Sequence, residues 1–408
     1  MQLTLDHSCH KVEATLTITG SKSETNRLLL LQSLYPELSI ENASNSDDSV
    51  AMQKALNAKD PVKDIHHAGT AMRFLTAYYA AKEGEEIILT GSARMQERPI
   101  SLLVDALRSL GADITYGNIE GYPPLKIRGK KLEGGSVRLP ANISSQYISA
   151  LLLVAPQLKE GLNLYLEGEI TSLPYIKMTL ALLKRIGIAA SFSENKITIP
   201  YQPTTNKQSQ TVESDWSSAS YWFSVLALCD HGKIILSSYR EDSLQGDAVL
   251  IEIYSKMGVE AYFENEQLIL HKKPHFILPK SIHLNLVEAP DIAQTIAVSC
   301  YGLGLECKLT GLHTLKIKET DRLLALEKEL SKLGAKIRVD KDSLHLSAEQ
   351  NFQQNQFIDT YHDHRMAMAF APLALKVPLT INDAGVVSKS YPGFWEDMQK
   401  SGFQLIEK

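Results

Sequence analysis

The order of apolar and polar residues along the chain predicts a recurring unit of two helices and four short strands. Five helix-like segments end in a glycine that precedes a strand-like run, and glycine is the usual residue just past a helix. These glycines are Gly111, Gly187, Gly258, Gly334 and Gly402. After the first four come two short strand-like runs, so the pattern predicts a recurrent strand–helix–strand–helix–strand–strand unit.

The first helix of each unit marks the length of the repeat. Its start is predicted at Ser23, Thr70, Ser145, Ser217, Asp291 and His364. The later starts are roughly seventy residues apart, whereas the first two are closer together. The chain is therefore predicted to hold six copies, the first shortened and the last ending after one strand. We expect the N-terminal run 2–18 to supply what the last copy lacks.

The order of the elements also predicts the fold class. Alternating strands and helices favour parallel pairing with right-handed crossovers, as in α/β proteins. The stretch 201–213 is polar and aperiodic, which is typical of a loop, and it separates the third copy from the fourth. We predict two domains of three copies each, one of residues 20–213 and one of residues 1–19 plus 214–408.

The amino-acid composition excludes some classes of function. Of 408 residues, 44% are apolar and 22% charged, which is typical of a soluble globular protein. The net charge of −5 argues against a nucleic-acid or membrane-surface binder, since these usually carry a basic excess. The four cysteines lack CxxC spacing, which favours incidental thiols in a reducing compartment. The N-terminus has no signal-peptide pattern, so a cytoplasmic location is expected.

Cations gather at the predicted helix starts in both halves of the chain. They are Lys22, Arg98, Lys318, Arg322, Arg365 and Lys389. One such charge is more often a solvated surface group, but cations at the positive end of many helices cost stability unless anions bind there. We therefore predict a cleft between the domains that takes small polyanions, with Asp291 and Glu319 placed for proton transfer.

Other signals limit the chemistry of this predicted site. The chain lacks the phosphate-binding pattern GxxxxGK[ST], and no GxGxxG follows a strand. Its histidine and cysteine spacings predict no zinc site, so arginine and lysine are left to neutralise the anions. Ser144, Ser145, Gln146, Ser172 and Tyr175 open helices and are either plain caps or ligand-binding groups.

These motifs, in this order, resemble the 5-enolpyruvylshikimate-3-phosphate synthase family. They include Gly20-Ser21-Lys22-Ser23, Ala68-Gly69-Thr70-Ala71-Met72-Arg73, Glu97-Arg98-Pro99, Ser144-Ser145-Gln146, Gln245-Gly246-Asp247, Pro290-Asp291, Lys318-Glu319-Thr320-Asp321-Arg322 and Asp363-His364-Arg365. The resemblance implies a two-domain, inside-out α/β barrel built from six βαβαββ repeats. It also implies transfer of the enolpyruvyl group of phosphoenolpyruvate to shikimate 3-phosphate, a step of the shikimate pathway.

The resemblance assigns roles to individual residues. Those expected on shikimate 3-phosphate are Ser23, Arg27, Ser144, Ser145, Gln146, Ser172, Tyr175, Asp291, Thr314 and Lys318. Those expected on phosphoenolpyruvate are Lys22, Gly69, Arg98, Gln146, Arg322, His364, Arg365 and Lys389. Lys22, Asp291 and Glu319 are the candidates for proton transfer, and the sequence leaves open which acts as acid and which as base. Neither a metal nor a cofactor is implied, and a monomer is expected.

Three positions depart from the family pattern. Phe74 stands where the family often has proline, Thr314 where it has asparagine, and Leu173 where lysine is frequent. Gly69 is retained, so the resemblance implies inhibition by glyphosate, which the family binds beside that glycine.

Two rival interpretations remain open. One is the sister transferase acting on UDP-N-acetylglucosamine, whose family typically has a reactive cysteine in its N-terminal domain, but no cysteine lies between Cys9 and Cys229. The other is a non-catalytic anion-binding relative. The presence of Lys22, Asp291 and Glu319 argues against it.

Overall fold

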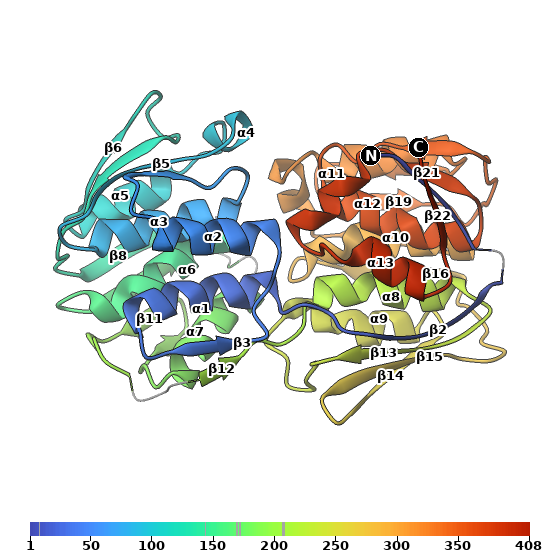
Figure 1. Ribbon diagram of the computed structural model, residues 1–408, viewed down its shortest axis with the longest axis horizontal. Helices are drawn as coiled ribbons and strands as arrows, with labels where there is room; N and C mark the ends of the chain where they lie inside the picture. The colour runs from blue at the N-terminus through green and yellow to red at the C-terminus, as the bar shows by residue number, and fades with distance from the viewer. Residues whose placement is uncertain (8, 143, 169, 171–172, 206–208) are drawn as a thin grey trace. The chain divides into compact units, whose positions relative to one another are not determined.

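The protein folds into two compact units (Figure 1). The computed structural model describes residues 1–408 except 8, 143, 169, 171–172 and 206–208. The N-terminal unit holds Gly20–Val212, and the C-terminal unit holds Met1–Thr19 together with Glu213–Lys408. Each unit is built from helices packed against short sheets. Among the described residues, no helix has the length and apolar character needed to span a membrane.

The N-terminal unit contains the elements from α1 to β12. Its helices are α1 (Lys22–Leu34), α2 (Asp47–Asn57), α3 (Gly69–Ala81), α4 (Ala93–Gln96), α5 (Ser101–Ser109), α6 (Ser145–Val154), the 3-10 helix η1 (Ala155–Gln157) and α7 (Leu173–Arg185). Its strands are β3 (Ser39–Glu41), β4 (Val62–Asp64), β5 (Glu86–Thr90), β6 (Asp113–Tyr116), β7 (Leu125–Arg128), β8 (Gly135–Pro140), β9 (Leu162–Glu167), β10 (Ser191–Ser193), β11 (Lys196–Ile199) and β12 (Ser209–Thr211).

The C-terminal unit contains the remaining elements and the first two strands. Its strands are β1 (Leu3–Asp6), β2 (Lys11–Leu16), β13 (His231–Ser237), β14 (Val259–Glu264), β15 (Gln267–Lys272), β16 (Ser281–Asn285), β17 (Glu306–Thr310), β18 (Ile337–Val339), β19 (Leu344–Leu346), β20 (Gln356–Ile358), β21 (Leu379–Ile381) and β22 (Gln404–Glu407). Its α-helices are α8 (Trp216–Leu228), α9 (Leu250–Ser255), α10 (Ala293–Leu303), α11 (Arg322–Lys332), α12 (His364–Phe370) and α13 (Phe394–Lys400). Its 3-10 helices are η2 (Gly246–Val249), η3 (Pro290–Ile292), η4 (His313–Ile317), η5 (Ala371–Leu375) and η6 (Ala384–Lys389).

One sheet pattern recurs through the molecule. Each four-stranded sheet has a parallel pair followed by two antiparallel strands, as in the order β4-β5-β7-β6. The orders β8-β9-β11-β10, β2-β13-β15-β14 and β16-β17-β19-β18 repeat it. The first helix of each copy begins within two residues of its predicted start. The predicted α/β class and the repeated unit are therefore confirmed.

The N-terminal strands complete sheets that belong to the end and the middle of the chain. β1 lies antiparallel between β21 and β22, and so takes the place of the strand that the last copy lacks. β2 pairs in parallel with β13, while β3 pairs in parallel with β12. The first copy has no hairpin of its own, because only a short loop joins α2 to β4.

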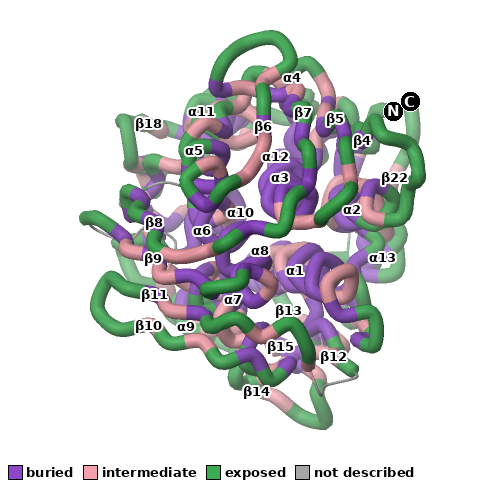
Figure 2. The backbone as a smooth tube through the Cα atoms, turned by 90° about the vertical axis from the view of Figure 1, so that its left-hand side faces the viewer, coloured by how far each residue is buried: buried purple, intermediate pink, exposed green. Residues whose placement is uncertain are grey.

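The helices form the interior of each unit, and the sheets cover them. In the N-terminal unit, α3 and α6 are buried along most of their length, and Figure 2 shows α3 in the colour of buried residues. In the C-terminal unit, α8 and α10 are buried almost throughout. These helices are apolar on nearly all sides, which is typical of helices enclosed by other elements. The strand β8, by contrast, alternates buried and exposed residues.

Candidate active site

The first group of candidate residues lies at the start of α1. Ser21 caps this helix, and its side chain accepts a hydrogen bond from the Glu24 N–H. The Lys22 ammonium lies 3.2 Å from one carboxylate oxygen of Asp48, and His67 Nε2 lies 3.7 Å from the other. Lys22 is predicted from the sequence, but Asp48 and His67 are not. Asp48 stands in the first turn of α2, where an acidic residue is ordinary.

Arg27 lies one turn further along α1 and is almost completely buried. Its Nε donates to Thr179 Oγ1 at 2.8 Å, and its Nη1 donates to the Ser23 carbonyl at 2.8 Å. Nη2 donates to Ser149 Oγ at 3.0 Å and to the Tyr175 carbonyl at 3.3 Å. Burial lowers the pKa of Arg27 to about 10. The fold thus joins Ser23, Arg27 and Tyr175, three of the predicted residues, in one hydrogen-bond network.

Gly69 begins α3, and Arg98 lies directly against it. A Cβ atom at position 69 would lie 2.7 Å from Arg98 Nη1, so the close approach requires glycine. Arg73 donates to the Gly69 carbonyl at 3.1 Å and to the Pro99 carbonyl at 3.4 Å. Burial, and then the charge of Arg98, lowers the pKa of Arg73 to about 10. Two guanidinium groups next to one helix start favour the binding of an anion.

The start of α6 supplies the next predicted residues. Ser144 caps the helix and accepts a hydrogen bond from the Gln146 N–H. The Gln146 side chain donates to Thr70 Oγ1 at 3.1 Å, which links α6 to the first turn of α3. Ser145 is buried at this junction. Ser172, also predicted to bind substrate, lies outside the described residues.

In the C-terminal unit, the guanidinium of Arg322 binds three carboxylates. Nε donates to Asp363 at 2.6 Å, Nη1 to Asp291 at 2.8 Å and Nη2 to Glu319 at 2.8 Å. Burial lowers the pKa of Arg322, but the three carboxylates together raise it well above its ordinary value. Arg322 therefore remains charged and fixes both proton-transfer candidates, Asp291 and Glu319, in place.

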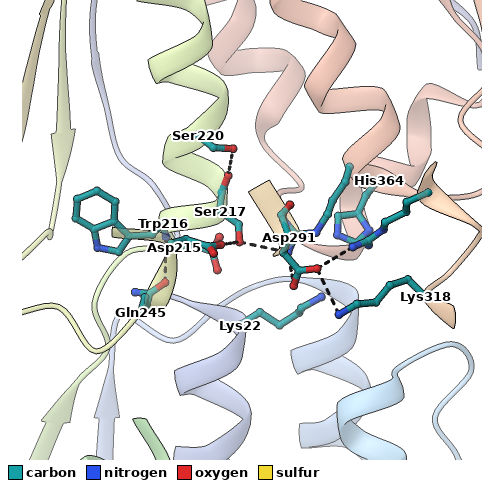
Figure 3. Close-up of polar contacts among 12 residues, drawn as sticks. Lys22, Asp215, Trp216, Ser217, Ser220, Gln245, Asp291, Lys318 and His364 are labelled. Atoms are coloured by element: carbon teal, nitrogen blue, oxygen red, sulfur yellow. Dashed lines mark hydrogen bonds and ion pairs between the residues drawn. The ribbon is translucent and has the colours of Figure 1, made fainter. Parts of the chain in front are cut away.

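Asp291 is surrounded by further cations (Figure 3). Lys318 Nζ lies 3.3 Å from Oδ1, and Arg365 Nη2 lies 3.4 Å from Oδ2. Arg365 also donates to Ser217 Oγ at 3.2 Å, and Ser217 in turn donates to the buried carboxylate of Asp247. Burial is the main cause that raises the pKa of Asp247 to about 6. In the sequence, Ser217 and Asp247 have the pattern of caps and packing residues, which does not indicate this contact.

The remaining predicted residues lie around this cluster. His364 is buried at the start of α12, with Nδ1 3.8 Å from Asp363 Oδ1, and Asp363 caps the same helix. Lys389 donates to the His362 carbonyl at 2.7 Å. The hydroxyl of Thr314 is buried, and within the described part of the chain it has no hydrogen-bond partner. A ligand oxygen or nitrogen would satisfy it.

The cluster places acidic side chains, which can carry protons, next to basic side chains, which can attract anionic reactants. A carboxylate can accept a proton, and the cations beside these carboxylates can offset the charge of anionic reactants. Among the described residues, no cluster of three or more histidine, cysteine or acidic side chains is arranged to hold a metal ion.

Fold and site together define the class: an α/β protein of repeated βαβαββ units with cationic side chains at its helix starts and paired carboxylates. Comparison with known proteins agrees. A structure of EPSP synthase from Acinetobacter baumannii at 2.37 Å superposes with a TM-score of 0.82 at 22% identity, and the match covers all of both chains. A second structure of that enzyme gives a TM-score of 0.81. These likenesses establish the inside-out, two-domain α/β fold.

Sequence comparison identifies the family to which the chain belongs. Residues 50–398 match the family model of EPSP synthase (3-phosphoshikimate 1-carboxyvinyltransferase). A protein of that name from Bacteroides fragilis is 46% identical and covers 97% of both chains. Another, from Colwellia psychrerythraea, is 35% identical over 97% of this chain and 98% of its own. The chain belongs to the EPSP synthase family of transferase enzymes.

Proposed function

We propose that this protein transfers the enolpyruvyl (1-carboxyvinyl) group of phosphoenolpyruvate to the 5-hydroxyl of shikimate 3-phosphate and releases phosphate. The observation that carries the proposal is that one buried guanidinium, Arg322, binds both Asp291 and Glu319 in a chain of this family. The reaction is the step of the shikimate pathway that leads toward chorismate and the aromatic amino acids.

The proposed reaction is an addition followed by an elimination. In the addition, the 5-hydroxyl oxygen bonds to C2 of phosphoenolpyruvate, C3 gains a proton, and the hydroxyl proton passes to a carboxylate. In the elimination, the bond from C2 to the phosphate oxygen breaks, C3 loses a proton, and the double bond is restored. Asp291 and Glu319, with Lys22 as a third group, are the proposed carriers of these protons.

Both substrates are anions, and we propose that the cations at the helix starts bind them. Residues proposed for shikimate 3-phosphate are Ser23, Arg27, Ser144, Ser145, Gln146, Ser172, Tyr175, Asp291, Thr314 and Lys318. Residues proposed for phosphoenolpyruvate are Lys22, Gly69, Arg98, Gln146, Arg322, His364, Arg365 and Lys389. The close packing of Arg98 on Gly69 and the unsatisfied hydroxyl of Thr314 support this assignment. In this scheme the N-terminal unit mainly serves shikimate 3-phosphate.

A phosphate-release assay tests the function. The protein is mixed with phosphoenolpyruvate and either shikimate 3-phosphate or UDP-N-acetylglucosamine, and inorganic phosphate is measured. Release only with shikimate 3-phosphate is expected. Release only with the sugar nucleotide would identify the sister transferase, and binding without release would identify a non-catalytic relative.

The role of Glu319 is tested by Glu319→Gln. The amide keeps the shape of the side chain and loses the ability to carry a proton, so we expect kcat to fall by a factor of about 100 or more while the Kd of shikimate 3-phosphate changes little. Glu252→Gln, an exposed substitution on α9, is the matched control. Turnover of Glu319→Gln near that of the control would refute the assigned role.

We further propose that the enzyme acts as a monomer in the cytoplasm, without metal or organic cofactor. The proposed reaction needs no redox or Lewis-acid group, since the side chains named above supply the charges and proton carriers. The cysteines are free, and Cys229, Cys300 and Cys307 are buried thiols, which suits a reducing compartment. Light scattering of the purified protein tests whether it is a monomer. Turnover after treatment with a chelator tests whether the reaction needs a metal.

A further inference from the structure

Arg27 lies where four helices of the N-terminal unit meet. It belongs to α1, and its hydrogen-bond acceptors belong to α1, α6 and α7. Of the five N–H groups of a guanidinium, four donate to neutral oxygens: the hydroxyls of Thr179 and Ser149 and the carbonyls of Ser23 and Tyr175. Among the described residues, no acceptor is found for the second Nη1 N–H, so we take this group as the one available to a ligand. The direction of that N–H depends on the plane in which the guanidinium is held.

Two aromatic rings lie against this guanidinium. The Cζ atom of Arg27 is 5.4 Å from the centre of the Phe74 ring and 6.0 Å from that of Tyr175. Phe74 is fully buried and belongs to α3, which joins α1, α6 and α7 as the fourth helix at this junction. A cation over the face of an aromatic ring is attracted by its quadrupole, and the attraction is stronger in a site without water. Burial lowers the pKa of Arg27 to about 10, because the charged form loses its contact with water. The attraction to the ring faces offsets part of that loss.

We infer that Phe74 is a positioning residue for shikimate 3-phosphate, which it serves by holding the guanidinium of Arg27 in the plane that presents its remaining N–H. The inference rests on the proposed function. The competing explanation is that Phe74 only fills the core. Core filling affects stability, whereas positioning affects the two substrates unequally.

The experiment compares Phe74→Leu and Phe74→Met, which keep apolar volume at position 74 and remove the aromatic face. The Kd of shikimate 3-phosphate is measured by calorimetry, and the KM of phosphoenolpyruvate at saturating shikimate 3-phosphate. We expect the Kd to rise about tenfold and the KM to change less than twofold. Phe223→Leu, the same change in the buried core of α8, is the control and should leave the Kd within twofold of wild type.

A double-mutant cycle tests whether Phe74 acts through Arg27. Arg27→Met removes the charge, so adding Phe74→Leu to it should change the Kd by less than twofold. An equal effect of Phe74→Leu in both backgrounds, or an equal loss toward both substrates, would overturn the inference in favour of core filling. Wild-type affinity in both Phe74 variants would also overturn it. If the wild-type protein binds no shikimate 3-phosphate, the proposed function itself fails, which is a distinguishable result.

Discussion

Single side chains in this protein carry several contacts each, and Arg322 is the clearest case. Its guanidinium binds Asp291, Glu319 and Asp363 at once, because its planar fork presents N–H donors in several directions. Removing one partner of a buried ion pair leaves an uncompensated charge, so each member of this group depends on the others. The arrangement holds three acidic side chains against one buried guanidinium.

Gly69 is a position where one added carbon has a defined effect. In Gly69→Ala, the new Cβ would lie 2.7 Å from Arg98 Nη1, so the guanidinium must move away. We expect the KM of phosphoenolpyruvate and the inhibition constant of glyphosate to rise about tenfold or more, with the Kd of shikimate 3-phosphate within twofold. Gly393→Ala, at a site with open space and an ordinary φ of −83°, is the control for stability. An unchanged KM would show that Arg98 does not contact phosphoenolpyruvate.

Asp247 predicts a dependence of stability on pH. Burial raises its pKa from 3.8 to about 6, so the folded protein favours the protonated form. The stability contributed by that protonation is complete below pH 3.8 and is lost as the pH rises through about 6. The Asp247→Asn variant has an amide at this position, so it lacks the carboxyl group that titrates. We expect the free energy of unfolding of the variant, relative to wild type, to increase by about 2 kcal/mol between pH 4 and pH 7.

Urea denaturation across this pH range measures the effect of Asp247→Asn. Asp242→Asn, an exposed change in the turn that precedes η2, should show no such trend. A difference between Asp247→Asn and wild type that stays constant with pH would mean that folding does not shift the pKa of Asp247.

Helix starts carry most of the candidate residues, so their caps matter for the site. Ser21, Ser144 and Asp363 cap α1, α6 and α12, and each is followed directly by residues proposed to bind substrate. A capped start fixes the backbone of the first turn, because it satisfies N–H groups that have no partner within the helix. The caps therefore contribute both to helix stability and to the placement of the charged side chains.

The cap of α11 provides a test. Asp321 Oδ1 accepts hydrogen bonds from the Leu323 and Leu324 N–H groups, each at 3.2 Å, and Arg322 follows it directly. Asp321→Ala should lower the free energy of unfolding by about 1 kcal/mol and speed hydrogen exchange at these two amides, whereas Asp321→Ser should restore most of both. Equal behaviour of the alanine and serine variants would argue against a capping role.

The whole molecule depends on pairing between distant parts of the chain. β1 lies between β21 and β22, and β2 lies beside β13, so the N-terminus is part of the C-terminal unit. Such pairing closes very long loops, which costs chain entropy that must be recovered by burial. The last copy of the repeat is therefore complete only when the first residues of the chain are in place.

Leu5 of β1 tests this dependence. It is fully buried opposite Leu379 and Leu405, so Leu5→Ala should lower the free energy of unfolding by about 2–4 kcal/mol. Hydrogen exchange should accelerate in β21 and β22 but not in β4 and β5 of the other unit. Lys11→Ala, at an exposed position of β2, is the control. Uniform acceleration in both units would contradict the assignment of β1 to one unit.

The sequence was sufficient for features that depend on near neighbours along the chain. The repeat, the helix starts and the glycines after the helices follow from periodicity and capping, which act over a few residues. The cations at the helix starts were visible for the same reason, and together with the motif order they indicated the family and most of the candidate residues.

Only the tertiary structure decided which distant groups meet. The sequence did not place Asp48 beside Lys22, Asp247 against Ser217, or Phe74 over the guanidinium of Arg27, because each pair joins separate helices or loops. It also did not assign β1 and β2 to different sheets. Packing between segments far apart in the chain determines these contacts, and local periodicity carries no information about it.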